Sequence, residues 1–420
     1  MLLRFSRCTL TIIMFLLTLV ACTSAKNVVT AIASPSSTSV PPTATSTETP
    51  TPTSTPVAMT ERCAEILPAF PEGRVPPGIL VLSPAGELSL LNFREHTKRS
   101  IAGDFWTVGA SPNGKWLSYV IFTPIDNGAD VTMDLIVEST DGEKQAQLSF
   151  DPNWFTGIDI PWLDNERMWF PVLNKKDVNP PTLVLNPFTG EQQILLADYP
   201  NFNPYYYGPV GTPPLFFDDS NVAYDPSLRY VAYPQNADDG LYVALWDRET
   251  ERTVAKVFSG GLYELRPLWL PDGSAFVVAA FPDKDTPLRE WFLMGGDGEI
   301  RQLTHLGKLY SKYGFGQTAS LSPDGRYLVF GLYVGDFGPR DLVILDLHTL
   351  EMVNTCLKLS TIPFWSPDSQ YLAVSHWDAD KMQSSVIVLD VEEGWAATVF
   401  TDDNEAMHTT LPRGWLVSGE

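Results

Sequence analysis

One short phrase decides the fold, and its clearest copy reads Ser322-Pro-Asp-Gly-Arg-Tyr-Leu-Val-Phe330. Proline pre-sets φ for the second position of a type I turn, Asp suits the third position, and glycine relieves the exit from the turn. The phrase therefore predicts a tight hairpin. The strand after the turn is apolar at nearly every position, and a strand that is apolar on both faces must be covered on both faces.

Copies of this phrase recur along the chain at a regular distance. The anchor residues of the copies are Pro112, Leu163, Pro226, Pro271, Pro323, Pro367 and Pro412. The anchors are separated by 51, 63, 45, 52, 44 and 45 residues. This spacing is the period of one four-stranded propeller blade with loops of variable length.

A second hairpin follows each copy, with a turn such as Thr140-Asp-Gly142 and a more polar last strand such as Glu299–Leu303. The N-terminal copy lacks its first strand, and a strand without its hairpin stands at the C-terminus. Both Gly78–Ser83 and Trp415–Ser418 resemble the second strand of that blade, so a three-plus-one and a two-plus-two division stay open. We predict an all-β fold over residues 78–420, a seven-bladed β-propeller of four-stranded antiparallel blades. Six or eight blades are alternatives, and the N- and C-terminal strands are expected to share a blade and close the ring.

Two of these phrases resemble the WD-like repeat of TolB-type β-propellers, which is found in many exported bacterial proteins. They are Trp365-Ser-Pro-Asp-Ser369 and Arg301-Gln-Leu-Thr304. The resemblance covers about Gly78–Val417 and implies the propeller fold, while it says little about function. The separate N-terminal α/β domain of TolB has no counterpart here, so a role with its envelope partners is not carried over.

The first residues predict export. Arg4 and Arg7 precede the apolar run Cys8–Val20, which is too short to span a bilayer and fits a signal peptide. The run ends in Leu19-Val20-Ala21-Cys22, which resembles a bacterial lipobox. We expect residues 1–21 to be removed and Cys22 to be acylated, which anchors the protein in a membrane. The alternative is an ordinary secretory signal with an incidental cysteine. The expected location is extracytoplasmic, on the bacterial cell membrane or cell surface.

The tract after Cys22 cannot form a core. Twenty of the twenty-three residues from Ser34 to Pro56 are Ser, Thr or Pro, which bury too little apolar surface to offset their conformational entropy. We interpret residues 22–57 as a disordered stalk and residues 58–77 as a lead-in to the propeller. Removal of the signal peptide changes the formal net charge from −22 to −24, and so acidic a chain is not expected to bind nucleic acid.

Two cysteines are left in the mature fold, Cys63 and Cys356. In an oxidising compartment we expect them to form a disulfide between the lead-in and the edge of a blade, with two separate buried thiols as the alternative. The sequence contains no GxSxG nucleophile motif, and its five histidines lack metal-binding spacing. We therefore predict no catalytic residues, no metal site and no cofactor, although the sequence leaves open whether catalysis occurs.

Aromatic residues give the best candidate for a ligand face. They lie where the last strand of one blade passes to the first strand of the next, which is a common ligand-binding side of propellers. The candidates are Trp106, Trp154, Tyr205, Tyr206, Tyr207, Tyr263, Arg266, Tyr310 and Tyr313. Aromatic residues and arginine are typical binding anchors, but these rings could instead fill the channel mouth and the gaps between blades.

Three functions are compatible with these features. The favoured hypothesis is a membrane-anchored binding or scaffold module for a protein or peptide partner. The second is glycan binding or processing, because aromatic loops can stack on sugar rings. A role in envelope assembly is a weaker third, which rests on analogy alone.

Overall fold

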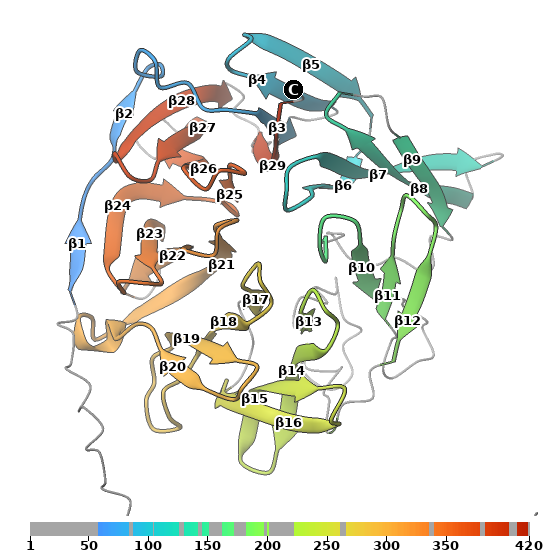
Figure 1. The fold of residues 1–420 in the computed structure, drawn as a ribbon. Coiled ribbons are helices and arrows are strands. Elements are labelled where there is room, and N and C mark those ends of the chain that lie inside the picture. The colour runs from blue at the N-terminus through green and yellow to red at the C-terminus, as the bar shows by residue number, and fades with distance from the viewer. Residues whose placement is uncertain are drawn as a thin grey trace, which may run out of the picture. The chain divides into compact units, whose positions relative to one another are not determined.

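The described strands form antiparallel groups around a centre (Figure 1). The computed structural model describes residues 58–83, 87–103, 105–125, 130–141, 145–150, 162–171, 182–196, 200, 222–260, 266–335, 340–378, 383–402 and 410–418. All described strands belong to one compact unit, Thr55–Glu420. The predicted signal peptide, Cys22 and the whole of the predicted stalk lie outside the described residues. The predicted all-β propeller fold is confirmed.

Four groups are separate four-stranded or three-stranded sheets in the first part of the fold. Their strands are β29 (Leu411–Leu416), β3 (Ile79–Ser83), β4 (Glu87–Asn92) and β5 (Thr97–Ala102); β6 (Phe105–Ala110), β7 (Trp116–Ile125), β8 (Asp130–Ser139) and β9 (Gln145–Phe150); β10 (Met168–Pro171), β11 (Thr182–Leu185) and β12 (Gln192–Leu195); and β13 (Ala223–Tyr224), β14 (Tyr230–Ala237), β15 (Gly240–Asp247) and β16 (Arg252–Phe258). The three-stranded group has in addition a bridge between Trp162 and Met168 at its inner edge.

Three further groups follow. Their strands are β17 (Leu268–Trp269), β18 (Ala275–Ala280), β19 (Glu290–Gly295) and β20 (Ile300–Gln302); β21 (Tyr313–Leu321), β22 (Tyr327–Val334), β23 (Arg340–Asp346) and β24 (Met352–Leu359); and β25 (Phe364–Trp365), β26 (Tyr371–Asp378), β27 (Gln383–Asp390) and β28 (Trp395–Asp402). The last two groups are joined by the pair Leu359–His376. The short 3-10 helix η3 (Leu306–Lys308) lies between β20 and β21.

Strands from the two ends of the described fold share one sheet. β29 pairs antiparallel with β3, with Trp415 opposite Leu80. The C-terminal part thus contributes one strand and the N-terminal part contributes three, β3 to β5. The sequence could not decide between this division and two strands from each end, because both candidate segments are short and apolar.

Alternate residues of one strand pack into two different interfaces. In β22, Leu328 and Phe330 belong to the buried cluster shared with β19, whereas Val329 packs with Leu372 and Val374 of β26. Side chains of a strand point alternately to opposite faces, so both faces of this sheet are covered. The described residues form seven such buried clusters, which include contacts between neighbouring groups.

The repeated turn is held by its own polar side chains. The Ser322 hydroxyl lies 2.5 Å from Asp324 Oδ1 and accepts a hydrogen bond from the Tyr327 N–H at 2.9 Å. The same bonds recur in Ser111–Trp116 and in Ser366–Tyr371. The serine that opens the phrase is therefore a structural part of the turn, because it satisfies a backbone donor that the turn would otherwise leave unpaired.

Neighbouring turns contact one another in a closed series. The contacts are Asn113 N to Asn165 Oδ1 (2.9 Å), Arg167 Nη2 to Pro226 O (2.6 Å), Gly273 against Pro226, Gly325 against Pro271, Asp324 N to Ser369 Oγ (3.1 Å) and Gly114 against Pro367. The last contact passes over the shared sheet, where β29 and β3 are the two chain ends and no hairpin joins them. Val417 N also donates to Gly114 O at 2.8 Å, which ties β29 to this contact.

A second link ties the two hairpins of one sheet together. Arg229, which follows the first turn, donates to Asp247 at 2.9 Å, and Asp247 also accepts the N–H groups of Glu249 and Thr250. Arg326 and Asp346 repeat this arrangement. The hydrogen bond from Arg229 lowers the pKa of Asp247 from its ordinary 3.8 to about 2, against the opposing effect of burial.

The first prediction concerns the contact that passes over the shared sheet. Gly114 has φ of 68°, and an added Cβ would lie 2.7 Å from Pro367 Cγ and 3.0 Å from Val417 N. Gly190 has φ of 73° but open space around its Cα. Gly190→Ala should therefore lower the free energy of unfolding by about 1–2 kcal/mol, the cost of a left-handed alanine, and Gly114→Ala by clearly more. Guanidinium titration measures both, and equal losses would contradict the contact.

The second prediction concerns pH. Because the pKa of Asp247 is lowered in the fold, its stabilisation is complete above about pH 4 and is lost as the pH falls toward 2. We expect Asp247→Asn to cost about 2 kcal/mol at pH 7 and roughly half of that at pH 3. Urea titrations of the wild type and the variant at both pH values measure the difference. Asp285→Asn, at an exposed residue, is the control, and a difference for Asp247→Asn that does not change with pH would refute the assignment.

Candidate functional site

The aromatic candidates predicted from the sequence are only partly described. Trp154, Tyr205, Tyr206, Tyr207 and Tyr263 lie outside the described residues, and for Trp106 the structure describes the backbone, in β6, but not the side chain. Their role as a ligand face stays a prediction. Arg266, Tyr310 and Tyr313 can be placed.

Tyr313 is buried and helps to hold the connection between two sheets. Its hydroxyl lies 3.0 Å from Oε1 of Glu290, whose carboxylate also accepts Thr304 Oγ1 at 2.6 Å and the Leu306 and Gly307 N–H groups at 2.8 Å. Burial, together with the Glu290 charge, raises the pKa of Tyr313. These contacts favour a structural role for Tyr313.

The other two candidates also have partners in the fold. The Tyr310 ring is half-buried and meets the Tyr313 ring edge-on, with 6.4 Å between centroids. The Arg266 guanidinium lies 4.5 Å above the ring of Trp169, a cation–π contact between segments that are far apart in the sequence. None of these three residues lines the cavity described next.

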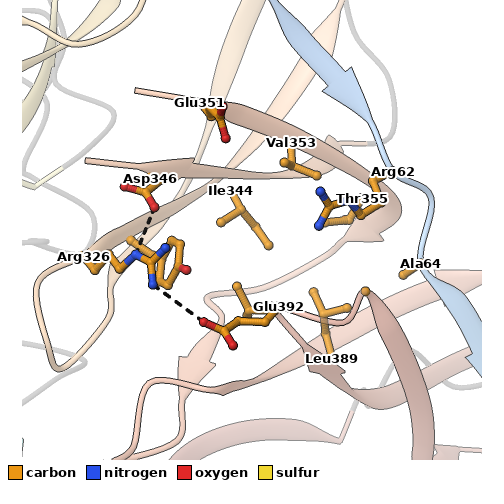
Figure 2. Close-up of a pocket in the computed structure, with 13 residues that line it drawn as sticks. Arg62, Ala64, Arg326, Ile344, Asp346, Glu351, Val353, Thr355, Leu389 and Glu392 are labelled. Atoms are coloured by element: carbon orange, nitrogen blue, oxygen red, sulfur yellow. Dashed lines mark hydrogen bonds and ion pairs between the residues drawn. The ribbon is translucent and has the colours of Figure 1, made fainter. Parts of the chain in front are cut away.

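A cavity of about 270 Å³ lies at the seam between the sheets β21–β24 and β25–β28 (Figure 2). Its apolar wall consists of Ile344 on β23, Val353 on β24, and Leu389 and Val391 at the end of β27. We call this cavity the seam pocket. The sequence did not indicate it, because its walls come from segments as far apart as Arg62 and Gly394, which are separated by 332 residues.

Charged residues surround this apolar wall. Arg326 donates to Asp346 at 2.9 Å, lies 3.6 Å from Glu392, and covers the Tyr327 ring at 4.6 Å. Burial would raise the pKa of Asp346, but hydrogen bonds from the Thr349 and His348 N–H groups and from Arg326 lower it. Asp346 is therefore held as a carboxylate. Its ion pair with Arg326 is the same interaction that connects the two hairpins of this sheet.

The lead-in forms the remaining wall of the seam pocket. Its strand β1 (Met59–Glu61) pairs parallel with β24, and its strand β2 (Glu65–Leu67) pairs parallel with β28. Arg62 N donates to Asn354 O at 3.0 Å and Ala64 N donates to Thr355 O at 2.9 Å. The lead-in thus crosses the seam from one outer edge to the other, and Arg62 and Ala64 line the pocket. No strand was predicted in residues 58–77 from the sequence.

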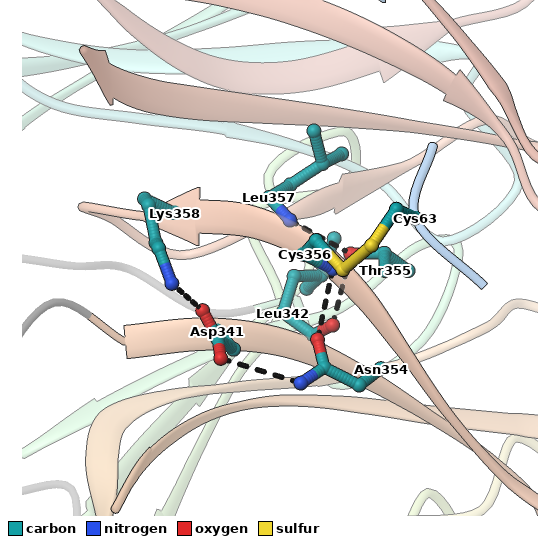
Figure 3. The surroundings of a disulfide bond; sticks show 8 residues. All are labelled: Cys63, Asp341, Leu342, Asn354, Thr355, Cys356, Leu357 and Lys358. Carbon is teal, nitrogen blue, oxygen red and sulfur yellow. Dashed lines mark hydrogen bonds and ion pairs between the residues drawn. A yellow bond between two sulfur atoms is a disulfide. The ribbon is translucent and has the colours of Figure 1, made fainter. Parts of the chain in front are cut away.

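A disulfide between Cys63 and Cys356 holds the middle of this crossing (Figure 3). It is the pairing expected from the sequence. Cys356 lies in an irregular stretch of β24, where the pairing with β23 shifts between Asp341 and Val343, and its φ is 61°. A bulge of this kind redirects a side chain from the sheet. The side-chain oxygen Oδ1 of Asn354 accepts a hydrogen bond from the Cys356 N–H at 2.8 Å and stabilises the bulge.

The seam pocket has the features of a binding site. The Thr355 hydroxyl donates to Leu342 O at 2.9 Å, so this hydroxyl is already used by the fold. An apolar wall with a few charged groups provides affinity and orientation for a ligand.

In the described part of the chain, no three His, Cys, Asp or Glu side chains are grouped so as to hold a metal ion. No helix among the described residues has the length and apolar character needed to cross a membrane.

The third prediction tests how the lead-in is held. Replacing both cysteines, Cys63→Ser with Cys356→Ser, should lower the free energy of unfolding by about 2–5 kcal/mol. It should also free the lead-in for cleavage by trypsin after Arg62 and Arg74, as followed by mass spectrometry. Treatment of the wild type with a reductant should have the same effect. Unchanged cleavage at these arginines would mean that β1 and β2 hold the lead-in without the disulfide.

No protein-family model and no curated protein sequence matches the chain. Several solved structures are similar to it. TolB of Acinetobacter baumannii is 12% identical, with 84% of this chain and 87% of that chain covered and a TM-score of 0.43. Oligogalacturonate lyase of Vibrio parahaemolyticus is 12% identical, with 78% of this chain and 87% of that chain covered and a TM-score of 0.48. The propeller domain of the trilobed protease of Pyrococcus furiosus is 13% identical, with 70% of this chain and 84% of that chain covered and a TM-score of 0.43. These are similarities of fold, and the chain has the fold of a β-propeller.

Proposed function

We propose that this protein is an extracytoplasmic, membrane-anchored β-propeller that binds a peptide segment of a partner protein in the seam pocket. The observation that carries the proposal is the composition of this pocket. It combines an apolar wall of Ile344, Val353, Leu389 and Val391 with charged groups of both signs, and the lead-in closes it on one side. A peptide segment offers matching apolar and charged side chains, whereas a folded domain is too large to enter.

Two features support the location. The N-terminal residues have the pattern of a signal peptide, residues 1–21, that is cut before Cys22, which would receive the acyl chains of the membrane anchor. The disulfide between Cys63 and Cys356 is independent of this pattern. Disulfides persist in oxidising compartments and are rare in the cytosol. The Ser/Thr/Pro tract would then act as a spacer between the membrane and the propeller.

The chemistry of the pocket supports binding rather than catalysis. Arg326 and Asp346 are paired with each other, and the Tyr327 ring stacks on Trp365 at 6.0 Å beneath Arg326. Groups held by such structural contacts are poorly placed to move protons or to attack a substrate. The net charge of −22 opposes the binding of nucleic acid.

The fourth prediction fills the seam pocket from its lead-in side. Ala64 is half-buried and lines the pocket, so Ala64→Phe should place a ring in the cavity and prevent ligand binding. Ala102→Phe, at an exposed end of β5 in a sheet that does not line the pocket, is the matched control. The full-length chain and both variants are used to capture partners from envelope extracts, and captured proteins are identified by mass spectrometry. Thermal unfolding verifies that the variants are folded.

We expect Ala64→Phe to lose a partner protein that the wild type and Ala102→Phe retain. An unchanged set of captured proteins would refute the assignment of the seam pocket. The same three chains are tested on a glycan array and with polysaccharide substrates. Specific glycan capture or turnover would replace this proposal with glycan binding or processing, the alternative considered from the sequence.

A further inference from the structure

We infer that the seam pocket selects a segment of mixed charge, with a carboxylate at Arg62, an apolar side chain on the wall and a basic group at Glu351. This inference rests on the proposed function and specifies the ligand class of the same site. It follows from two charged groups that the fold leaves unpaired at different positions around the apolar wall.

Arg62 is the first of these groups. Its backbone is held on both sides, by the pairing of β1 with β24 and by the disulfide of Cys63. Figure 2 shows its side chain directed from the lead-in toward the wall formed by Ile344 and Val353. No described carboxylate forms an ion pair with it. A planar guanidinium beside an apolar surface is suited to a carboxylate, which it can bind through two parallel hydrogen bonds.

Glu351 is the second group. It is exposed and forms no ion pair with a described residue. Glu351 directly precedes β24, and it lines the pocket together with Val353 and Thr355 of this strand. Arg62 lies beside Thr355, because Ala64 N and Arg62 N bind the carbonyl groups of residues 355 and 354. At about 3.3 Å per residue of extended chain, the backbones of Glu351 and Thr355 are about 13 Å apart.

The other charges of the pocket are already engaged. Arg326 is paired with Asp346 and lies near Glu392. A ligand therefore meets an unpaired positive group at the lead-in and an unpaired negative group at the other end of the same wall, which corresponds to about four extended residues of backbone. The acidic protein repels a purely anionic ligand at long range. A mixed-charge peptide avoids this repulsion and pairs both free groups locally.

The test uses synthetic peptides of defined charge. The reference peptide is acetyl-Lys-Ala-Val-Leu with a free terminal carboxylate. One derivative has a terminal amide, and a second has Gln in place of Lys. Binding to the full-length chain is measured by titration calorimetry. Because a hydrogen bond to a charged group contributes appreciably to binding, we expect each derivative to bind about tenfold more weakly or worse.

Variants assign the two contacts separately. In Arg62→Gln the acid and the amide peptides should bind equally, and in Glu351→Gln the Lys and the Gln peptides should bind equally. Arg94→Gln and Glu299→Gln remove exposed charges from other sheets and should bind like the wild type. Because the two controls change the net charge by the same amounts at other positions, these equalities separate direct pairing from a general effect of net charge.

Three outcomes would overturn the inference. Equal binding of all peptides to the wild type, with binding still lost in Ala64→Phe, would refute the charge preference and leave the pocket as a binding site. Binding that survives Ala64→Phe would refute the proposed site as well. If the reference peptide does not bind while a partner protein is still captured through the pocket, the ligand class is wrong and the proposed function stands.

Discussion

The structure depends on strands that are apolar on both faces. In β22, Leu328 and Phe330 pack toward one neighbouring sheet and Val329 packs toward the other, so neither face can be left to water. A sheet of this kind requires a neighbour on each side. The same need at the two ends of the series is met by pairing β29 with β3, which buries Leu80 and Trp415 in one shared sheet. Packing of a sheet between two neighbouring sheets is thus the way in which this sequence buries its hydrophobic side chains.

The shared sheet has no hairpin turn between its two innermost strands, and the neighbouring turns contact each other across it. Elsewhere a hairpin turn caps the inner end of each sheet and contacts the next turn. Since β29 and β3 are chain ends, the turns on either side meet directly through Gly114 and Pro367. The glycine has a double role, because it adopts a left-handed conformation and leaves space for the proline. The hydrogen bond from Val417 to Gly114 adds the C-terminal strand to this contact.

The candidate site arises from the segment outside the ring. The lead-in adds one strand to each of two neighbouring sheets and crosses the seam between them, where the disulfide fixes Cys63 to the bulge at Cys356. This crossing turns a groove between two sheets into a walled pocket with Arg62 at its rim. Edge strands offer unpaired backbone groups, and covering two of them with the lead-in also protects them from unwanted association.

Residue patterns alone predicted the repeated turn, the strands covered on both faces, the sharing of a sheet by the chain ends, and the cysteine pair. The turn and the strands follow from local turn chemistry and periodicity, the shared sheet follows from the incomplete repeats at the two ends, and the cysteine pair follows from the two cysteines left in the mature fold. The division of the shared sheet, the formation of β1 and β2 by the lead-in, and the placement of Arg62 and Glu351 around one cavity became known from the fold. Tyr313, expected at a ligand face, is instead bound to Glu290 in the fold. Such placements depend on contacts between segments hundreds of residues apart, and no local pattern records them.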